Sequence, residues 1–190
     1  DKAFTDEDIS GNVTDNVVGD IDKYGGMAGY FDSFDVIPVS EDQLYRGDLI
    51  LVNYEHEYRF SDDTDIVSVF DFKTPSYKVS NTSVSLTRGT VDIFNSMLDD
   101  FYSESECPFV TVVSGFRSRE FQDELFEKRV ESDGRDEAMK YVSLPGYSEH
   151  HTGLAMDLSV YDSEGKSYYL SDYDDCLWLR DNFYRYGFVL

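Results

Sequence analysis

Basic residues are scarce in this chain, whereas acidic residues are abundant. Against 16 lysines and arginines stand 39 aspartates and glutamates, so the formal net charge is −23 at neutral pH. A surface of that sign repels phosphate backbones and anionic membranes, and it attracts divalent cations and basic peptides. We therefore expect no nucleic-acid partner, and we interpret most of the negative charge as a solvated surface.

Cysteine is also scarce, because Cys107 and Cys176 are the only two in 190 residues. Two cysteines so far apart exclude a disulfide framework and a cysteine-rich zinc knuckle. The sequence leaves open a single disulfide between them, if the protein is secreted. The interpretation that we favour is two separate buried thiols.

Long apolar runs are missing, so no transmembrane segment is expected in this chain. The N-terminus, which begins DKAFTDED, has no basic and then apolar signal pattern, and a removed export signal or anchor stays open. Hydrophobic residues nevertheless make up 41% of the chain and aromatic residues 16%, which is ample for a globular core.

The chain divides into two parts of different character. Residues 1–43 are acidic, dotted with glycine and without hydrophobic periodicity, which predicts an irregular N-terminal arm. In residues 44–190, apolar segments at 49–52, 109–116 and 154–162 are typical of strands, with an EGKS turn after the last. Helices are predicted within 90–104, 118–134 and 171–187. Because these elements interleave without a regular βαβ rhythm, the predicted fold is α+β, a mostly antiparallel sheet flanked by about three helices.

Capping residues and apolar faces support the three helices. Thr90 and Ser118 are the expected N-caps of the first two helices, and Ser171 or Asp172 caps the third. The apolar face of the second helix is expected to comprise Phe121, Leu125 and Phe126, with Gly134 beyond its end; Gly187 ends the third helix.

The segment SEHHTGLAMD, residues 148–157, concentrates groups that can bind a metal. It holds two of the three histidines in the chain, and Asp157 stands in an otherwise apolar strand. A buried carboxylate costs several kcal/mol unless it is paired or bound to a metal. In an extended segment His150 and His151 point to opposite faces, so they are not expected to bind one ion together.

His150 and Asp157 converge if the loop curls at Gly153, since glycine adopts conformations closed to other residues. One imidazole and one carboxylate suit zinc, although a catalytic zinc site needs three protein ligands. The alternative is an exposed histidine pair and an aspartate hydrogen-bonded to loop amides. Spacing alone does not decide between the metal site and this alternative.

Two motifs together resemble the VanY-type zinc D-alanyl-D-alanine carboxypeptidases, which trim peptidoglycan and are related to VanX. SGFRSREFQ (114–122) matches the Ser-Gly-aromatic-Arg-Ser pattern of that family. PGYSEHHTGLAMD (145–157) matches Ser-x-His-x-x-Gly-x-Ala-x-Asp at every fixed position: Ser148, His150, Gly153, Ala155 and Asp157. The resemblance covers residues 44–190.

The resemblance implies a role for each site residue. His150 and Asp157 would be zinc ligands, and Arg117 would bind substrate oxygens and stabilise a developing oxyanion. Gln122 and Ser148 would contact the peptide, whereas no catalytic role is expected for His151. The residues alone also allow Arg117 to pair with Glu120 or another acid, Gln122 to be solvated, and Ser148 to cap a loop.

The Glu-x-Trp-His segment that supplies the family's general base and third zinc ligand is not found. Trp178, the single tryptophan, is followed by Leu, and no ligand role is expected for His56. The segment would be expected after Leu190, so residues 44–190 are interpreted as a VanY-like domain that is C-terminally incomplete or degenerate.

Three functional hypotheses follow from the resemblance. The first is a zinc-dependent D,D- or L,D-carboxypeptidase that trims D-alanine from peptidoglycan stem peptides, outside the cytoplasmic membrane or tethered to it. The alternative is a catalytically inactive cell-wall peptide-binding module that keeps Arg117, Gln122 and Ser148 for recognition. The third is an acidic surface protein whose motif is a relic.

Overall fold

The computed structural model describes residues 44–45, 50–60, 64–104, 110–162, 164–170 and 176–189. All of them belong to one compact unit, Ser40–Leu190. The predicted irregular arm, residues 1–43, lies outside the described residues, as do Ser171 and Asp172, the expected caps of the third helix.

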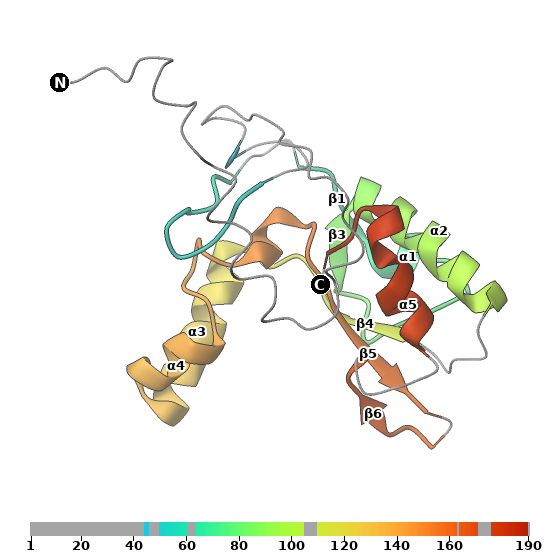
Figure 1. Cartoon of the computed structure of the whole chain (residues 1–190). Helices are drawn as coiled ribbons and strands as arrows, with labels where there is room; N and C mark the ends of the chain where they lie inside the picture. The colour runs from blue at the N-terminus through green and yellow to red at the C-terminus, as the bar shows by residue number, and fades with distance from the viewer. Residues whose placement is uncertain are drawn as a thin grey trace, which may run out of the picture. The chain divides into compact units, whose positions relative to one another are not determined.

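Two small sheets form the β structure (Figure 1). The larger has the strand order β2-β4-β5-β6: Lys78–Val79, Val110–Ser114, Asp157–Tyr161 and Ser167–Tyr168. Strands β2 and β4 are parallel, whereas β4–β5 and β5–β6 are antiparallel. The smaller sheet pairs β1 (Ile66–Ser68) with β3 (Ser85–Thr87) in antiparallel fashion. The predicted α+β fold with mostly antiparallel pairing is therefore confirmed.

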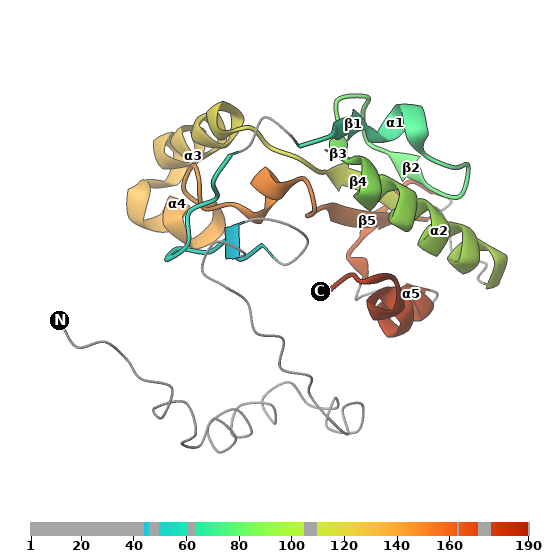
Figure 2. The same ribbon diagram turned by 90° about the horizontal axis from the view of Figure 1, so that it is seen from above.

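The described residues contain five α-helices, which are α1 (Val69–Phe72), α2 (Arg88–Glu104), α3 (Arg119–Asp133), α4 (Arg135–Tyr141) and α5 (Leu177–Asn182). Short 3-10 helices cover Glu149–Thr152 and Phe183–Tyr186. Figures 1 and 2 both show α3 and α4 together at one end and α1, α2 and α5 at the other. The chain that leads into β5, drawn in orange, runs between these groups. Among the described residues, no helix has the length and apolar character needed to cross a membrane.

Helix α2 carries the main core face, as its spacing predicts. Its buried residues recur at steps of three and four and pack with β4 and β5: Val91, Phe94, Met97, Leu98 and Phe101. The helix begins earlier than predicted, because the Thr87 hydroxyl accepts a hydrogen bond from the Thr90 amide at 3.2 Å. Thr87 therefore performs the capping expected of Thr90, which is itself buried in the first turn.

Helix α3 starts as predicted, with the Ser118 hydroxyl accepting from the Phe121 amide, and Gly134 follows its last residue at φ +84°. The expected apolar face is partly wrong, since Phe126 is buried but Phe121 is half exposed. The short helices α1 and α4 were not predicted, because each spans only one or two turns, too short for periodicity to show.

Two other expectations are wrong. Residues 50–52 form no strand in the described part of the segment 49–52. Cys176 is disulfide-bonded and not a free buried thiol. Cys107, the only other cysteine of the chain, lies outside the described residues.

Candidate active site

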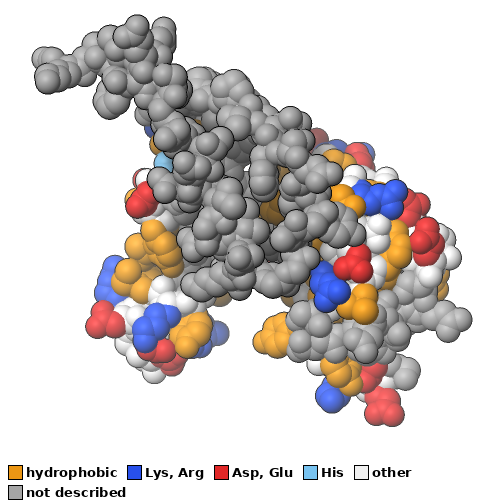
Figure 3. Space-filling model, in the orientation of Figure 1, with side chains coloured by type: hydrophobic (Ala, Val, Ile, Leu, Met, Phe, Trp, Pro, Cys, Tyr) orange, Lys and Arg blue, Asp and Glu red, His pale blue; other side chains and the backbone are white. Residues whose placement is uncertain are grey.

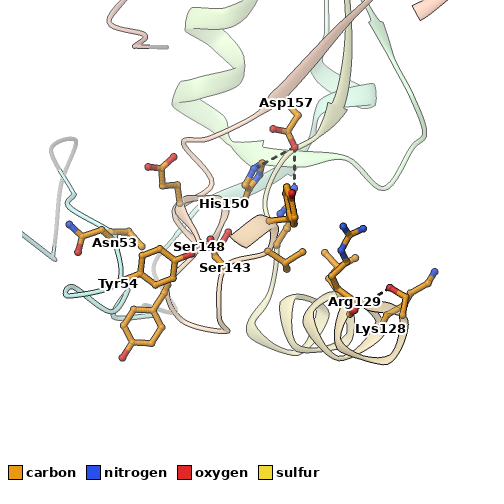
Figure 4. Close-up of a pocket in the computed structure, with 16 residues that line it drawn as sticks. Asn53, Tyr54, Lys128, Arg129, Ser143, Ser148, His150 and Asp157 are labelled. Atoms are coloured by element: carbon orange, nitrogen blue, oxygen red, sulfur yellow. Dashed lines mark hydrogen bonds and ion pairs between the residues drawn. The ribbon is translucent and has the colours of Figure 1, made fainter. Parts of the chain in front are cut away.

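A large open pocket of about 920 Å³ lies between the end of β4, helices α3 and α4, and the loop that precedes β5. Arg117, Ser148, His150 and Asp157 line it together, as Figure 4 shows for the labelled residues. Four of the five predicted site residues therefore meet in one cavity, which is large enough for a short peptide.

His150 is held with one ring nitrogen free to face the pocket. It lies in the 3-10 helix Glu149–Thr152, where Gly153 follows in the left-handed region at φ +70°. His150 Nδ1 lies 2.7 Å from the Gly115 carbonyl oxygen. Because a carbonyl can only accept, Nδ1 carries the proton and Nε2 keeps its lone pair. Nε2 lies 3.5 Å from Asp157 Oδ2 (Figure 4).

Asp157 is the first residue of β5 and is paired across the sheet with Ser114, the last residue of β4. The register brings its carboxylate to the pocket, where the side chain is 51% exposed. The adjacent His150 ring, together with the charge of Arg117, lowers the pKa of Asp157 against the opposing effect of burial. The carboxylate is therefore charged at neutral pH and suited to bind a cation.

Arg117 reaches the same carboxylate from the segment between β4 and α3. Its Nη2 lies 3.0 Å from Asp157 Oδ2, and its Nε and Nη2 donate to the Ser114 hydroxyl at 3.3 and 2.9 Å. Burial lowers the pKa of Arg117 and the Asp157 charge opposes that effect; a guanidinium stays protonated in either case. The acid that pairs with Arg117 is Asp157, and not Glu120.

Ser148 and Gln122 are placed differently. Ser148 is 3% exposed and lines the pocket, and its side chain makes no capping hydrogen bond to the 3-10 helix. Gln122 is fully buried, so the solvated alternative is wrong. It does not belong to the lining residues. Its Nε2 donates to the Ser143 carbonyl at 2.8 Å, and Ser143 does line the pocket.

His151 has a structural role that the sequence did not predict. It is fully buried, so the alternative of an exposed histidine pair is wrong. Its Nδ1 donates to the Arg117 carbonyl at 2.6 Å, and its Nε2 accepts from the Gly146 amide at 2.9 Å. Burial lowers the pKa of His151, in keeping with a neutral ring of fixed tautomer. The two rings contact different groups, and the expected extended segment is wrong here, because both histidines lie in a 3-10 turn.

The His150–Asp157 pair fits two positions of a zinc site. Ligands about 2.0–2.1 Å from a tetrahedral zinc ion lie about 3.3 Å apart, close to the 3.5 Å between Nε2 and Oδ2. The Gly115 carbonyl fixes the ring as an outer-shell acceptor does around metal-bound histidine. Within the described ranges no group of three or more His, Cys, Asp or Glu side chains could hold a metal ion.

The pocket also has a wall that the motifs did not reveal. It is formed by α3, α4 and the segment 52–54, and its described residues include Tyr54, Leu125, Lys128, Arg129, Ser132 and Tyr141. The signal in the sequence was the spacing of 125, 128, 129 and 132, which places these residues on one helix face.

Known proteins share sequence similarity with this chain. Residues 83–190 match the family model of VanY, D-alanyl-D-alanine carboxypeptidase. The protein YodJ of Bacillus subtilis (strain 168) is 34% identical over 109 residues, which are 55% of this chain and 38% of that protein. The chain thus spans well under half of that relative.

Two solved structures have a similar fold. One is the LD-carboxypeptidase LdcB, with a TM-score of 0.59 and 28% identity over 74% of this chain and 65% of that chain. The other is the D,D-pentapeptidase VanY from a VanB-type resistance cassette, in complex with Zn(II). Its TM-score is 0.55, with 24% identity over 74% of each chain, a similarity that concerns the fold alone.

Proposed function

Because the chain belongs to the VanY family of D-alanyl-D-alanine carboxypeptidases, we propose that it acts on peptidoglycan stem peptides and releases their C-terminal D-alanine. The observation that carries the proposal is the meeting of His150, Asp157 and Arg117 in one open pocket, with Asp157 Oδ2 within 3.5 Å of both other side chains. Similarity to both D,D- and LD-carboxypeptidases leaves D,D- and L,D-specificity as alternatives.

The cofactor that we propose is zinc, held by His150 Nε2 and the Asp157 carboxylate. Zinc bound there would polarise a peptide carbonyl and activate a water for hydrolysis. An imidazole nitrogen beside a charged carboxylate is a donor set that suits this ion. No third His, Cys, Asp or Glu joins this pair as a metal-binding group among the described residues.

Arg117 and Ser148 would bind and orient the substrate. The Arg117 side chain is 21% exposed, and contacts with Ser114 and Asp157 hold it at the pocket surface. A planar guanidinium binds a terminal carboxylate or a developing oxyanion with parallel hydrogen bonds. The Ser148 hydroxyl, two residues before His150 and in the same pocket wall, is placed to accept or donate a hydrogen bond to the peptide. Gln122 would act on the peptide only through Ser143, whose carbonyl accepts from its Nε2.

Action on peptidoglycan would require the protein to work outside the cytoplasmic membrane, secreted or associated with the cell wall. The disulfide of Cys176 supports this location, since disulfides persist mainly in oxidising compartments.

A second candidate is a wall-peptide-binding module without turnover. The observation that favours it is the two-residue metal pair, because no third ligand joins it in the described part of the chain. This module would keep the Arg117 and Ser148 contacts and bind the same stem peptides.

One assay separates the two candidates. The chain is incubated, with and without added Zn²⁺, with a pentapeptide ending in D-Ala-D-Ala, with a tetrapeptide ending in a single D-Ala, and with the L-Ala counterpart of each. Zinc-dependent release of D-alanine from either D-peptide supports the carboxypeptidase, and the peptide that is cleaved gives the specificity. Stereospecific binding without release supports the module. Equal treatment of D- and L-peptides contradicts both.

A further inference from the structure

The pocket face of α3 differs in charge from the rest of that helix. Four of its residues line the cavity at helical spacing: Leu125, Lys128, Arg129 and Ser132. Helix α3 also carries six acidic residues, and none of them lines the pocket. The acids are absent from the lining, although Asp133 lies one turn after Arg129 and pairs with it. The helix thus presents two cations and no carboxylate to the cavity.

The charge balance of the pocket lining is the reverse of that of the whole chain. The whole chain has 39 acidic and 16 basic residues, yet the pocket is lined by three cations, Arg117, Lys128 and Arg129, and two acids, Glu149 and Asp157. Both acids belong to the His150 end, and Asp157 is already paired with Arg117. The α3 wall therefore contributes two cations and no carboxylate to the lining, although Arg129 is paired with Asp133 outside it.

Arg129 and Lys128 have capacity left for an anion. Arg129 Nη2 pairs with Asp133 at 2.8 Å, while its buried Nε has no hydrogen-bond partner among the described residues. The guanidinium also lies 5.2 Å from the centre of the Tyr141 ring, which forms part of the same wall. No described acid lies within ion-pair distance of Lys128. Figure 4 shows both residues along α3, well separated from His150 and Asp157.

The length of α3 gives the span between the two ends of the pocket, because the Arg117 amide donates to the His150 carbonyl at 3.1 Å and so brings the start of the helix beside His150. Arg129 lies eleven residues after the N-cap Ser118, which corresponds to about 16 Å along the helix. An extended peptide advances about 3.3 Å per residue, so this span equals about five residues. A peptide whose C-terminus lies at His150 and Asp157 therefore reaches the cations with a residue four or five positions upstream.

We propose that Lys128 and Arg129 form a subsite for a carboxylate of the substrate peptide, four or five residues before its C-terminus. The proposal rests on the proposed function, because it assumes that the peptide's C-terminus binds at His150 and Asp157. The subsite selects acidic peptides over neutral ones of the same length. The competing explanation is that the two cations only stabilise the C-terminal half of α3, through its dipole and through Asp133.

Peptide binding to the full chain, measured by isothermal titration calorimetry, tests the subsite. The probes are acetylated hexapeptides ending in D-Ala-D-Ala that carry one glutamate at each upstream position in turn, with a glutamine counterpart for each. We expect glutamate to bind about three- to tenfold more tightly than glutamine at one position, four or five residues from the end. The preference should shrink at high salt, because the contact is exposed.

Charge variants identify the residues responsible. Lys128→Gln and Arg129→Gln should each reduce the glutamate preference, and Lys128→Glu should invert it. Lys140→Gln is the matched control, since Lys140 is an exposed lysine on α4 that does not line the pocket and pairs with Glu137. A purely helix-stabilising role predicts altered unfolding with an unchanged ratio of glutamate to glutamine affinity.

The outcomes are separable from those of the proposed function. If D-Ala peptides bind better than L-Ala peptides but glutamate and glutamine bind equally at every position, the subsite is wrong and the proposed function stands. A glutamate preference that survives in both Gln variants also overturns it. If no D-Ala peptide binds in preference to its L-Ala counterpart, both proposals fail.

Discussion

Arg117 Nη2 lies 3.0 Å from Asp157 Oδ2, the same oxygen that lies 3.5 Å from His150 Nε2. The arginine of one motif and the two proposed metal ligands of the other thus meet at the Asp157 carboxylate, although 40 residues separate Arg117 from Asp157. The antiparallel register of β4 and β5 makes this possible, because it sets Asp157 opposite Ser114, which also holds Arg117. Substitution of any of these side chains should therefore alter the surroundings of the Asp157 carboxylate.

Replacing either proposed metal ligand should abolish zinc retention. In Asp157→Asn the charge that attracts the cation is lost, and in His150→Ala the nitrogen donor is lost. We expect zinc affinity to fall at least about 100-fold in each, beyond the loss typical of an outer-shell change, and D-alanine release to stop. Metal content after dialysis measures the effect. Asp123→Asn, at an exposed position on α3, is the control. Normal zinc binding by Asp157→Asn would contradict the assignment of Asp157 as a ligand.

Arg117→Lys should keep the positive charge but lose the planar fork. A lysine cannot contact both the Ser114 hydroxyl and a substrate oxygen in the same plane. We expect kcat/KM for D-alanine release to fall about 100- to 1,000-fold, the usual cost of losing an oxyanion donor, with zinc content unchanged. Arg119→Lys, which alters an exposed pair with Glu57, is the matched control. Equal losses in the two variants would contradict the role of Arg117.

The resemblance to a known family named His150, Asp157, Arg117 and Ser148 as candidate site residues, and the structure brings their side chains to one pocket. Spacing alone did not predict this meeting, because Arg117 belongs to a separate motif. Helix α2 was predictable from its strong apolar period. The buried place of Gln122 and the double hydrogen bond of His151 depend on contacts with Ser143, Arg117 and Gly146, which no local pattern contains.

The cap of α2 and the buried face of α3 also depend on tertiary contacts that the sequence pattern does not contain. Thr87 and Thr90 are equally good caps by type, and the β3–α2 junction decides between them. Phe121 is apolar but faces solvent, because α3 packs through Gln122 and Phe126 instead. Tertiary packing therefore overrode propensity at those positions.

Gly115 should be intolerant of a side chain. A Cβ at this position would lie 2.3 Å from the backbone oxygen of Ser85, so the backbone must shift, and the Gly115 carbonyl that holds His150 would shift with it. We expect Gly115→Ala to lower the free energy of unfolding by about 1–3 kcal/mol and to weaken zinc binding. Urea denaturation and metal titration measure the two effects.

Gly89→Ala is the control for that substitution. Gly89 lies in the first turn of α2, and a Cβ there meets nothing within 4 Å. Alanine should stabilise the helix by about 0.5–1 kcal/mol without altering zinc affinity. If both alanine variants behaved alike, close packing at Gly115 would not be the cause.

His151→Leu should destabilise the fold far more than His151→Gln. Leucine leaves the Gly146 amide and the Arg117 carbonyl buried without their partner, at about 1–3 kcal/mol for each group. Glutamine retains one donor and one acceptor, so its cost should be below about 1.5 kcal/mol. Denaturant unfolding of both variants tests this, with His56→Leu as the control at a less buried histidine. Equal costs for Leu and Gln would show that packing against Tyr58 and Phe60, and not hydrogen bonding, governs the position.

Tyr77→Phe should change how stability depends on alkaline pH. Tyr77 is 1% exposed and donates to Asn95 Oδ1 at 2.8 Å. Burial, with the nearby charge of Asp99, raises its pKa well above 10.0. The unfolded chain therefore loses this proton first as the pH rises past about 10. The stability that the neutral phenol contributes is complete below pH 10 and declines above it, by up to about 1.4 kcal/mol per pH unit.

In Tyr77→Phe that decline should be absent, at the expense of about 1 kcal/mol at neutral pH for the lost hydrogen bond. Urea unfolding at pH 8, 9, 10 and 11 gives the two curves, which should converge as the pH rises because only the wild-type chain loses the Tyr77 contribution. Tyr102→Phe, at a side chain that is 55% exposed, is the matched control and should run parallel to the wild type. Parallel curves for Tyr77→Phe as well would mean that Tyr77 ionises as readily in the folded chain as in the unfolded one.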